Sequence, residues 1–129
     1  MKIKCPTEAE EAVQLMQWAL MHPICKNILI AIPNGGSRNF LEARNMKKQG
    51  VKAGVSDYFL PYPVGCKAGL WIELKRRDKK LSKLSDLQFA WLTQMHKVGY
   101  ACCVAYGAED AISRISGYLN GEFKCHLEK

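Results

Sequence analysis

The residues with the clearest chemical potential are Asp57, in one predicted strand, and Glu73 and Lys75, in the next. Residues two apart in a strand share a face, so Glu73 and Lys75 project together while Leu74 points into the core. If the two strands pair in register, Asp57 comes near Glu73. Two carboxylates at one point favour a divalent cation that relieves their repulsion, and oxygen ligands suit Mg²⁺ or Mn²⁺.

The main chain can complete this predicted metal site. The carbonyl of Leu74 would supply a third protein ligand and leave positions open for water and a phosphate oxygen, as metal-assisted hydrolysis requires. Lys75 lies within reach of that water, where its ammonium can orient the water and stabilise charge in the transition state. A general-base role is less favoured, because the neighbouring carboxylates raise the pKa of a lysine. The pattern predicts phosphodiester hydrolysis.

A simpler interpretation of the same spacing is a surface ion pair on an amphipathic strand. The position of the pair favours the chemical interpretation. Glu73 and Lys75 follow the apolar run Gly69–Ile72 and precede a basic cluster that would suit a phosphate-binding rim. That cluster consists of Arg76, Arg77, Lys79, Lys80 and Lys83.

Hydrophobic periodicity and turn residues predict the elements that must position these groups. In the first predicted helix, Val13, Met16 and Leu20 form the apolar stripe. Helices are predicted from Thr7 to about Met21 and over 40–49, 85–98 and 109–119, and strands over 27–32, 55–60, 69–75 and 100–106. The middle two strands form a hairpin, and the apolar last strand is predicted to be central. This order predicts an α/β fold, a mixed sheet flanked by helices, in a single domain over 1–129.

Composition narrows the class of partner. The 129 residues carry 19 Lys and Arg against 12 Asp and Glu, a net charge of +7, which favours a polyanionic partner, nucleic acid first. No apolar run approaches the roughly 18 residues that span a bilayer, and the polar N-terminus is unlike a signal peptide, so a cytoplasmic protein without membrane contact is expected. Six scattered cysteines without a Cys-x-x-Cys pair indicate reduced thiols rather than zinc ligands.

Four blocks of the sequence resemble the virus-type replication-repair nuclease domain, VRR-NUC, of the PD-(D/E)xK superfamily. They are Ile32–Arg38, Gly50–Asp57, Gly69–Lys75 and Leu84–Gln88. The resemblance runs from about Glu10 to Leu119 and implies a restriction-endonuclease-like core. One departure is Ser56, where the family usually has proline. Because proline does no chemistry there, activity is expected to survive.

The resemblance also implies roles for individual residues. Asp57 and Glu73 would hold the metal, Lys75 would assist the water, and Gln88 would support the site from the following helix. Glu10 resembles an additional acidic residue of the family that binds or orients a metal through water. Both Glu10 and Gln88 have a structural alternative, because Thr7-Glu8-Ala9-Glu10 and Ser85-Asp86-Leu87-Gln88 are capping boxes.

DNA contacts are expected from the basic rim and, through the resemblance, from Arg38. Asn34-Gly35-Gly36 before it is either a turn or a place where main-chain amides approach a phosphate. Lys47, Lys48 and Lys52 form a solvated face that would add salt-sensitive attraction for DNA. Trp71 shares a strand face with Glu73 and Lys75 and would border the substrate.

The resemblance implies a metal-dependent DNA endonuclease that acts on branched DNA or four-way (Holliday) junctions. Stand-alone members resemble junction-processing homodimers, in which two sites suit paired incisions. Compact members look phage-like, which would place the protein in the cytoplasm of a bacterial host. Two alternatives remain: a DNA-binding module that keeps the fold without turnover, and a sequence-specific restriction enzyme, for which the chain offers little material to read bases.

Overall fold

Four strands form one mixed sheet in the computed structural model, which describes residues 4–33, 40–124 and 127. The strands are β1 (Ile30–Ala31), β2 (Tyr58–Leu60), β3 (Leu70–Lys75) and β4 (Ala101–Tyr106), in the order β1-β2-β3-β4. β2 pairs with β1 and β3 in antiparallel fashion, whereas β3 and β4 run parallel. The predicted hairpin and the predicted mixed α/β sheet are therefore confirmed.

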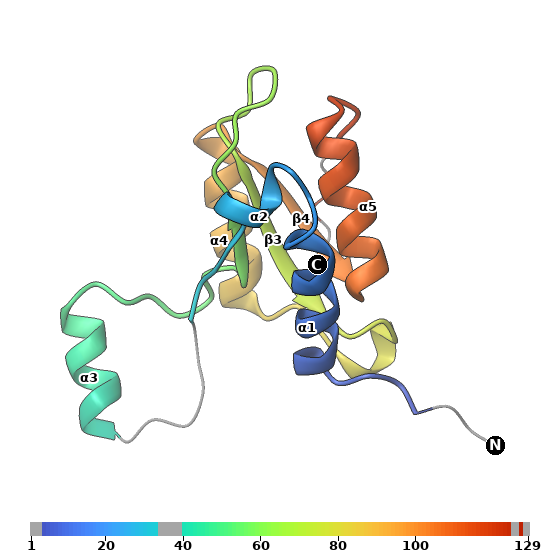
Figure 1. Ribbon diagram of the computed structural model, residues 1–129. Coiled ribbons are helices and arrows are strands. Elements are labelled where there is room, and N and C mark those ends of the chain that lie inside the picture. Colours follow the sequence, from blue (N-terminus) through green and yellow to red (C-terminus); the bar gives the residue numbers. More distant parts are fainter. Residues whose placement is uncertain (1–3, 34–39, 125–126, 128–129) are drawn as a thin grey trace.

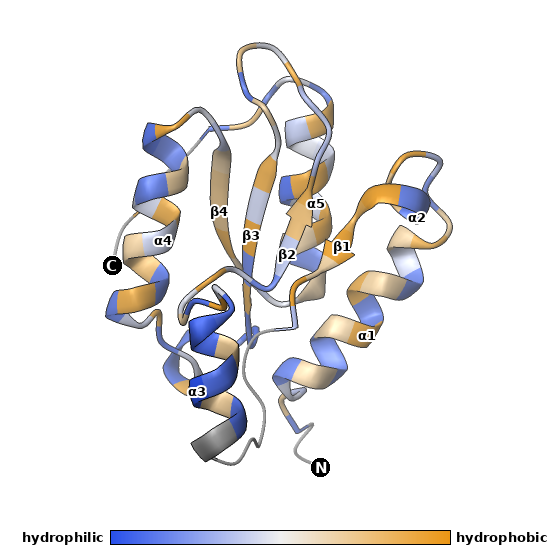
Figure 2. Cartoon of the chain, turned by 90° about the vertical axis from the view of Figure 1, so that its left-hand side faces the viewer, coloured by the Kyte–Doolittle hydropathy of each residue, from blue (hydrophilic) through white to orange (hydrophobic). Residues whose placement is uncertain are grey.

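Helices cover both faces of this sheet (Figure 1). They are α1 (Glu8–Ala19), α2 (Cys25–Ile28), α3 (Phe40–Lys48), α4 (Asp86–Lys97) and α5 (Ala108–Leu119), with a 3₁₀ turn at Lys79–Leu81. α1 and α5 lie on one face and α4 lies on the other. α3 stands apart from the sheet and is largely hydrophilic (Figure 2). The crossover through α4 allows β4 to run parallel to β3.

Alternation along β3 divides its side chains between the two faces. Leu70, Ile72 and Leu74 are buried in the main core, where they meet β4 and the inward side chains of α1 and α5. On the opposite face Trp71 stacks on Phe59 with ring centroids 4.3 Å apart. It also meets Trp91 of α4 edge-on at 5.2 Å. Trp71, which was predicted to border the substrate, therefore packs against Phe59 and Trp91.

Three sequence-based predictions about the elements were wrong in part. β4 lies at an edge of the described sheet rather than in its centre, and its apolar character reflects α4 and α5 packing on its two faces. The strand predicted over 27–32 contains the short helix α2, and strand pairing is confined to β1. In α1, Val13 and Leu20 are 59% and 62% exposed. The buried stripe is Glu11, Leu15 and Ala19, and a charged residue on that stripe obscures the apolar pattern.

Among the described residues, no helix is both long and apolar enough to span a bilayer.

Candidate active site

The register of the hairpin brings Asp57 and Glu73 together. Tyr58 pairs with Ile72, which places the preceding Asp57 opposite Glu73. Asp57 Oδ2 accepts a 2.7 Å hydrogen bond from the main-chain N–H of Leu74, which fixes this carboxylate at the start of β2. Glu73 is 1% exposed and Lys75 is 5% exposed. The strand pattern therefore places two carboxylates and an ammonium in a buried setting.

The electrostatics of the pair follow from this burial. Burial first, and then the charge of Asp57, raise the pKa of Glu73 to about 8 against the opposing charge of Lys75. Burial also raises the pKa of Asp57, while the hydrogen bond from Leu74 opposes that rise. The two carboxyl groups therefore compete for one negative charge. A positive charge placed between them would allow both to ionise.

Lys75 is held between the site and α4. Its Nζ lies 3.6 Å from Glu73 Oε1 and donates a 2.9 Å hydrogen bond to Gln88 Oε1. The same Gln88 oxygen accepts the main-chain N–H of Ser85 at 2.9 Å, and Ser85 Oγ accepts the N–H of Gln88. Gln88 therefore closes the first turn of α4, as its capping-box interpretation predicted, and contacts Lys75 at the same time. Its support of the catalytic site stays a prediction.

Glu10 lies outside this cluster. Its Oε1 accepts the main-chain N–H of Thr7 at 3.1 Å, and that bond together with the Thr7 side chain lowers the Glu10 pKa. The capping box predicted as its alternative is present. The side chain is exposed, and the pocket beside Asp57 is lined by other residues of α1.

Glu8, rather than Glu10, lines the pocket beside Asp57. It lines a pocket of about 260 Å³ with Ala12, Asp57 and Leu74. Partial burial and the charge of Asp57 raise the Glu8 pKa, and the charge of Lys75 opposes the rise. Glu8 is itself exposed, but it precedes Ala12 and Leu15, which pack at the core, by four and seven residues, so helical spacing was a sequence signal for it.

The oxygen atoms of this cluster fit a hard divalent cation. Glu73 Oε2 is buried and has no hydrogen-bond partner among the described residues. An ionised carboxylate oxygen in that position needs a positive partner. The N–H and C=O of one residue in an extended strand point to the same neighbour, so the Leu74 carbonyl faces the same edge as its N–H, beside Asp57. Within the described residues no three acidic, His or Cys side chains form a ready metal group, so this carbonyl and water would complete the ligand set.

Ser56 also carries an unpartnered group. The residue is fully buried, and its Oγ has no hydrogen-bond partner within the part of the chain that the structure describes. It precedes Asp57 at the position where the VRR-NUC pattern has proline. Its hydroxyl therefore contributes no described contact that holds Asp57, and the Leu74 N–H holds the carboxylate.

Comparison with known proteins supports the fold. No protein-family model and no curated protein matches the sequence. A solved structure described as a "VRR_NUC domain protein" is 27% identical, with a TM-score of 0.78 over 97% of this chain and 98% of that chain. The chain folds as a VRR-NUC domain. The match confirms the VRR-NUC resemblance inferred from the four sequence blocks.

Two of the predicted DNA-contacting arginines, Arg76 and Arg77, have partners within the chain. Arg76 donates from Nε to Pro6 O at 2.9 Å and from Nη2 to Cys5 O at 3.0 Å. Arg77 donates from Nε and Nη2 to the two oxygens of Glu11 at 2.9 and 2.8 Å. Both guanidinium groups therefore fasten α1 and the segment before it to the end of β3. These contacts were not expected from the sequence.

The other predicted DNA contacts are placed differently. Lys79 Nζ lies over the ring of Tyr106, 4.8 Å from its centroid. Lys80 is exposed, and its main-chain N–H donates to Asp78 at the start of the 3₁₀ turn. Arg38 lies outside the described residues. The role of these basic residues, and of Lys83, toward DNA stays a prediction.

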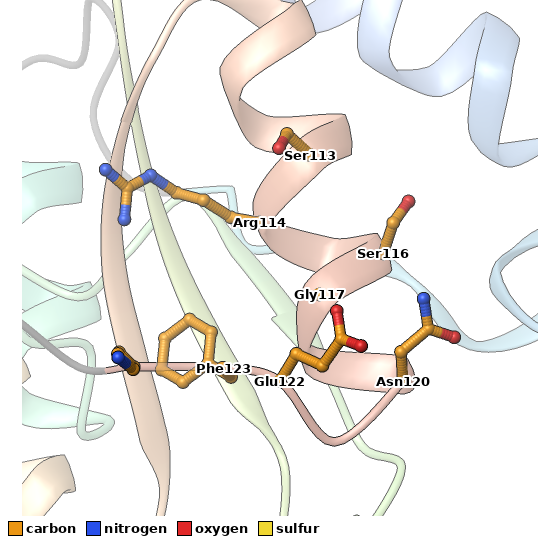
Figure 3. A pocket seen from close by; sticks show the side chains of 8 residues that line it. Ser113, Arg114, Ser116, Gly117, Asn120, Glu122 and Phe123 are labelled. Atoms are coloured by element: carbon orange, nitrogen blue, oxygen red, sulfur yellow. The ribbon is translucent and has the colours of Figure 1, made fainter.

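A second pocket of the VRR-NUC domain differs from this site in character. It measures about 430 Å³ and lies beside α5 and the turn that follows. Figure 3 shows that its side chains spread along the helix rather than converge on one point, and Arg114 pairs with Asp110 at 3.2 Å. Its lining includes a single carboxylate, Glu122, and no buried ion pair among the described residues. The buried Asp57–Glu73 cluster is therefore the better candidate for the active site.

Proposed function

We propose that this protein is a metal-dependent endonuclease that hydrolyses phosphodiester bonds in DNA. The observation that carries the proposal is the buried pair of Asp57 and Glu73 beside Lys75, with one Glu73 oxygen that has no partner among the described residues. A protein that needed this region for stability alone would gain more from apolar side chains, because buried acidic pairs are costly. The VRR-NUC fold supports nuclease chemistry.

The metal ligands would be Asp57, Glu73 and the Leu74 carbonyl, with Mg²⁺ or Mn²⁺ as the ion. Glu8 replaces Glu10 as the proposed additional acid of the first helix, because Glu8 shares the pocket of Asp57. A divalent ion bound there would lower the pKa of a coordinated water and neutralise charge on the scissile phosphate. Asp57 is already oriented for this role by the Leu74 N–H.

Lys75 is the proposed electrostatic residue of the reaction. Gln88 and Glu73 hold its ammonium on the face that carries the carboxylates. From this position the ammonium can orient the attacking water and stabilise the negative charge that builds on the phosphoryl oxygens. Two neighbouring acids favour its protonated form, which suits charge stabilisation better than proton abstraction.

Branched DNA or a four-way junction is the proposed substrate, and a twofold homodimer is the proposed form. The sequence resemblance to junction-processing VRR-NUC proteins supports both. The net charge of +7 supports a polyanionic partner of this kind. Two sites related by a dyad would suit incisions in opposed strands.

The test is a gel assay of Glu73→Gln beside the wild type. Labelled four-way junction, splayed arm, flap and linear duplex are incubated with Mg²⁺, Mn²⁺ or chelator, and Glu10→Gln is the matched control because that side chain lies outside the cluster. Metal-dependent incision should be lost in Glu73→Gln and kept in Glu10→Gln. Incision by pure Glu73→Gln removes Glu73 from the mechanism. Binding without incision by the wild type identifies the domain as a DNA-binding module.

A further inference from the structure

Arg76 ties the segment before α1 to the end of β3. It follows Lys75 directly, and its half-buried guanidinium donates to the carbonyls of Cys5 and Pro6 at 3.0 and 2.9 Å. These carbonyls lie immediately before Thr7, the N-cap of α1, and Glu8 is the first residue of that helix. Arg76 therefore links β3, which carries Glu73, to the point at which Glu8 enters the site.

A second bridge holds α1 on the other side of Glu8. The carboxylate of Glu11 is fully buried and accepts from Arg77 Nε, Nη2 and main-chain N–H at 2.8–3.0 Å. It also accepts the N–H of Ala108 at the start of α5, at 3.2 Å. Two consecutive arginines thus fasten the chain before and after Glu8. Arg77 holds the helix α1 itself through Glu11, whereas Arg76 holds the segment that leads into the helix.

We propose that Arg76 is a positioning residue that holds Glu8 beside Asp57 so that Glu8 can take part in metal binding. This inference rests on the proposed metal-dependent nuclease function. The first turn of a helix lacks intrahelical acceptors for its own N–H groups and frays readily, so the direction of a side chain at its first residue depends on what anchors the segment before it. Arg76 is the described side chain that anchors that segment to β3.

The chemistry of arginine suits this task. Its planar group carries donors in a fixed fork, which can reach two successive carbonyls at once, whereas lysine offers a single ammonium on a flexible stem. Its positive charge also favours the ionised form of Glu8. A guanidinium whose Nε and Nη2 are engaged by main-chain carbonyls is less available to a DNA phosphate, which was the role predicted for it from the sequence.

The test is a double-mutant cycle on Mn²⁺ binding in the absence of DNA. Free Mn²⁺ is followed by electron paramagnetic resonance with the wild type, Arg76→Gln, Glu8→Gln and the double variant. Loss of a residue that orients a ligand commonly costs about tenfold or more in metal affinity. We expect Arg76→Gln and Glu8→Gln each to weaken Mn²⁺ binding by about that factor, and the double variant to bind no more weakly than Glu8→Gln, because residues that act through one another are not additive.

Control variants distinguish a positioning role of Arg76 from the loss of a positive charge and from unfolding of the protein. Lys97→Gln removes an exposed positive charge at the last turn of α4 without touching the Cys5 and Pro6 carbonyls, and it should leave Mn²⁺ affinity unchanged. Arg76→Lys keeps the charge, and it should give intermediate affinity. Thermal unfolding of every variant is measured, and if Arg76→Gln is unfolded at the assay temperature the cycle is run with Arg76→Lys.

Each remaining outcome decides against the inference. If Arg76→Gln lowers Mn²⁺ affinity by the same factor in the wild type and in Glu8→Gln, Arg76 does not act through Glu8. Unchanged affinity in Arg76→Gln, with Mn²⁺ still released by Glu73→Gln, would overturn the role of Arg76 and leave the proposed function standing. Absence of Mn²⁺ binding by the wild type would overturn both.

Discussion

Gln88 Oε1 accepts two hydrogen bonds of the same length, 2.9 Å from Lys75 Nζ and 2.9 Å from the main-chain N–H of Ser85. One side-chain oxygen therefore joins the start of α4 to the proposed catalytic lysine. The helix cap sets the position of the oxygen, and the oxygen sets the position of the ammonium. Placement of Lys75 depends on α4 as well as on β3.

This relationship predicts separable effects of two substitutions at Gln88. Gln88→Ala removes the acceptor, so it should lower the DNA cleavage rate about tenfold or more and lower stability by about 1 kcal/mol through the weakened cap. Gln88→Glu retains an acceptor for both donors and should keep the stability. Single-turnover cleavage and thermal unfolding measure the two effects. A wild-type cleavage rate in folded Gln88→Ala would show that Lys75 needs no support from α4.

The raised pKa of Glu73 predicts how stability depends on pH without metal. The folded-state pKa is about 8, against an ordinary value of 4.5. Between these values the folded protein retains a proton that the unfolded chain releases, so stability is greatest below pH 4.5 and falls as the pH rises through 8. Each pKa unit of this difference corresponds to at most about 1.4 kcal/mol.

Thermal unfolding in chelator across that range measures the contribution of Glu73. The melting temperature of the wild type should fall more steeply with pH than that of Glu73→Gln, which has no proton to lose there. Added Mg²⁺ should reduce the difference at high pH, because bound ligand stabilises the ionised site. Parallel melting curves for the two proteins would show that Glu73 titrates normally.

Glu8 and Glu10 provide a matched pair of substitutions on one helix turn. Glu8→Gln should weaken Mn²⁺-supported cleavage about tenfold, because this side chain lines the pocket with Asp57. Glu10→Gln should leave cleavage unchanged, because its carboxylate closes the helix start and is otherwise exposed. Cleavage rates against Mn²⁺ concentration distinguish the two. The reverse ranking would restore Glu10 to the role that sequence resemblance gave it.

The contrast between these two glutamates shows what the sequence could predict. Asp57, Glu73 and Lys75 were placed correctly in space because strand alternation and hairpin register are local rules. The choice of Glu8 over Glu10 depends on the rotation of α1 against the sheet, which packing between distant segments decides. The buried ion pair of Glu11 and Arg77 joins two such segments, and no local pattern marks it.

The lack of local information about distant segments also explains why β4 was predicted to be a central strand. The run Tyr100–Tyr106 is apolar because helices cover both faces of β4, and that burial pattern resembles the pattern of a central strand. Periodicity reports whether a face is buried but does not report which strand lies beside it. The core of the fold was therefore predictable from local pattern, while the strand order and the contacts of Arg76 and Arg77 required the tertiary structure.

Lys47 and Lys48 in the last turn of α3 predict a salt-dependent contribution to DNA binding. Both lysines are exposed on a helix that stands apart from the sheet (Figures 1 and 2). Lys47→Gln with Lys48→Gln should weaken binding of every DNA structure by a similar factor. For each phosphate that these lysines no longer neutralise, the slope of log affinity against log salt should become shallower by about 0.9.

Fluorescence anisotropy in a Glu73→Gln background measures this binding without cleavage. The matched control replaces Lys26 and Lys97 by glutamine, since these exposed lysines lie on α2 and at the last turn of α4. Only the α3 pair should change the salt slope. An equal change in both double variants would mean that net charge alone attracts the DNA, because diffuse attraction depends on total charge and not on where the lysines lie.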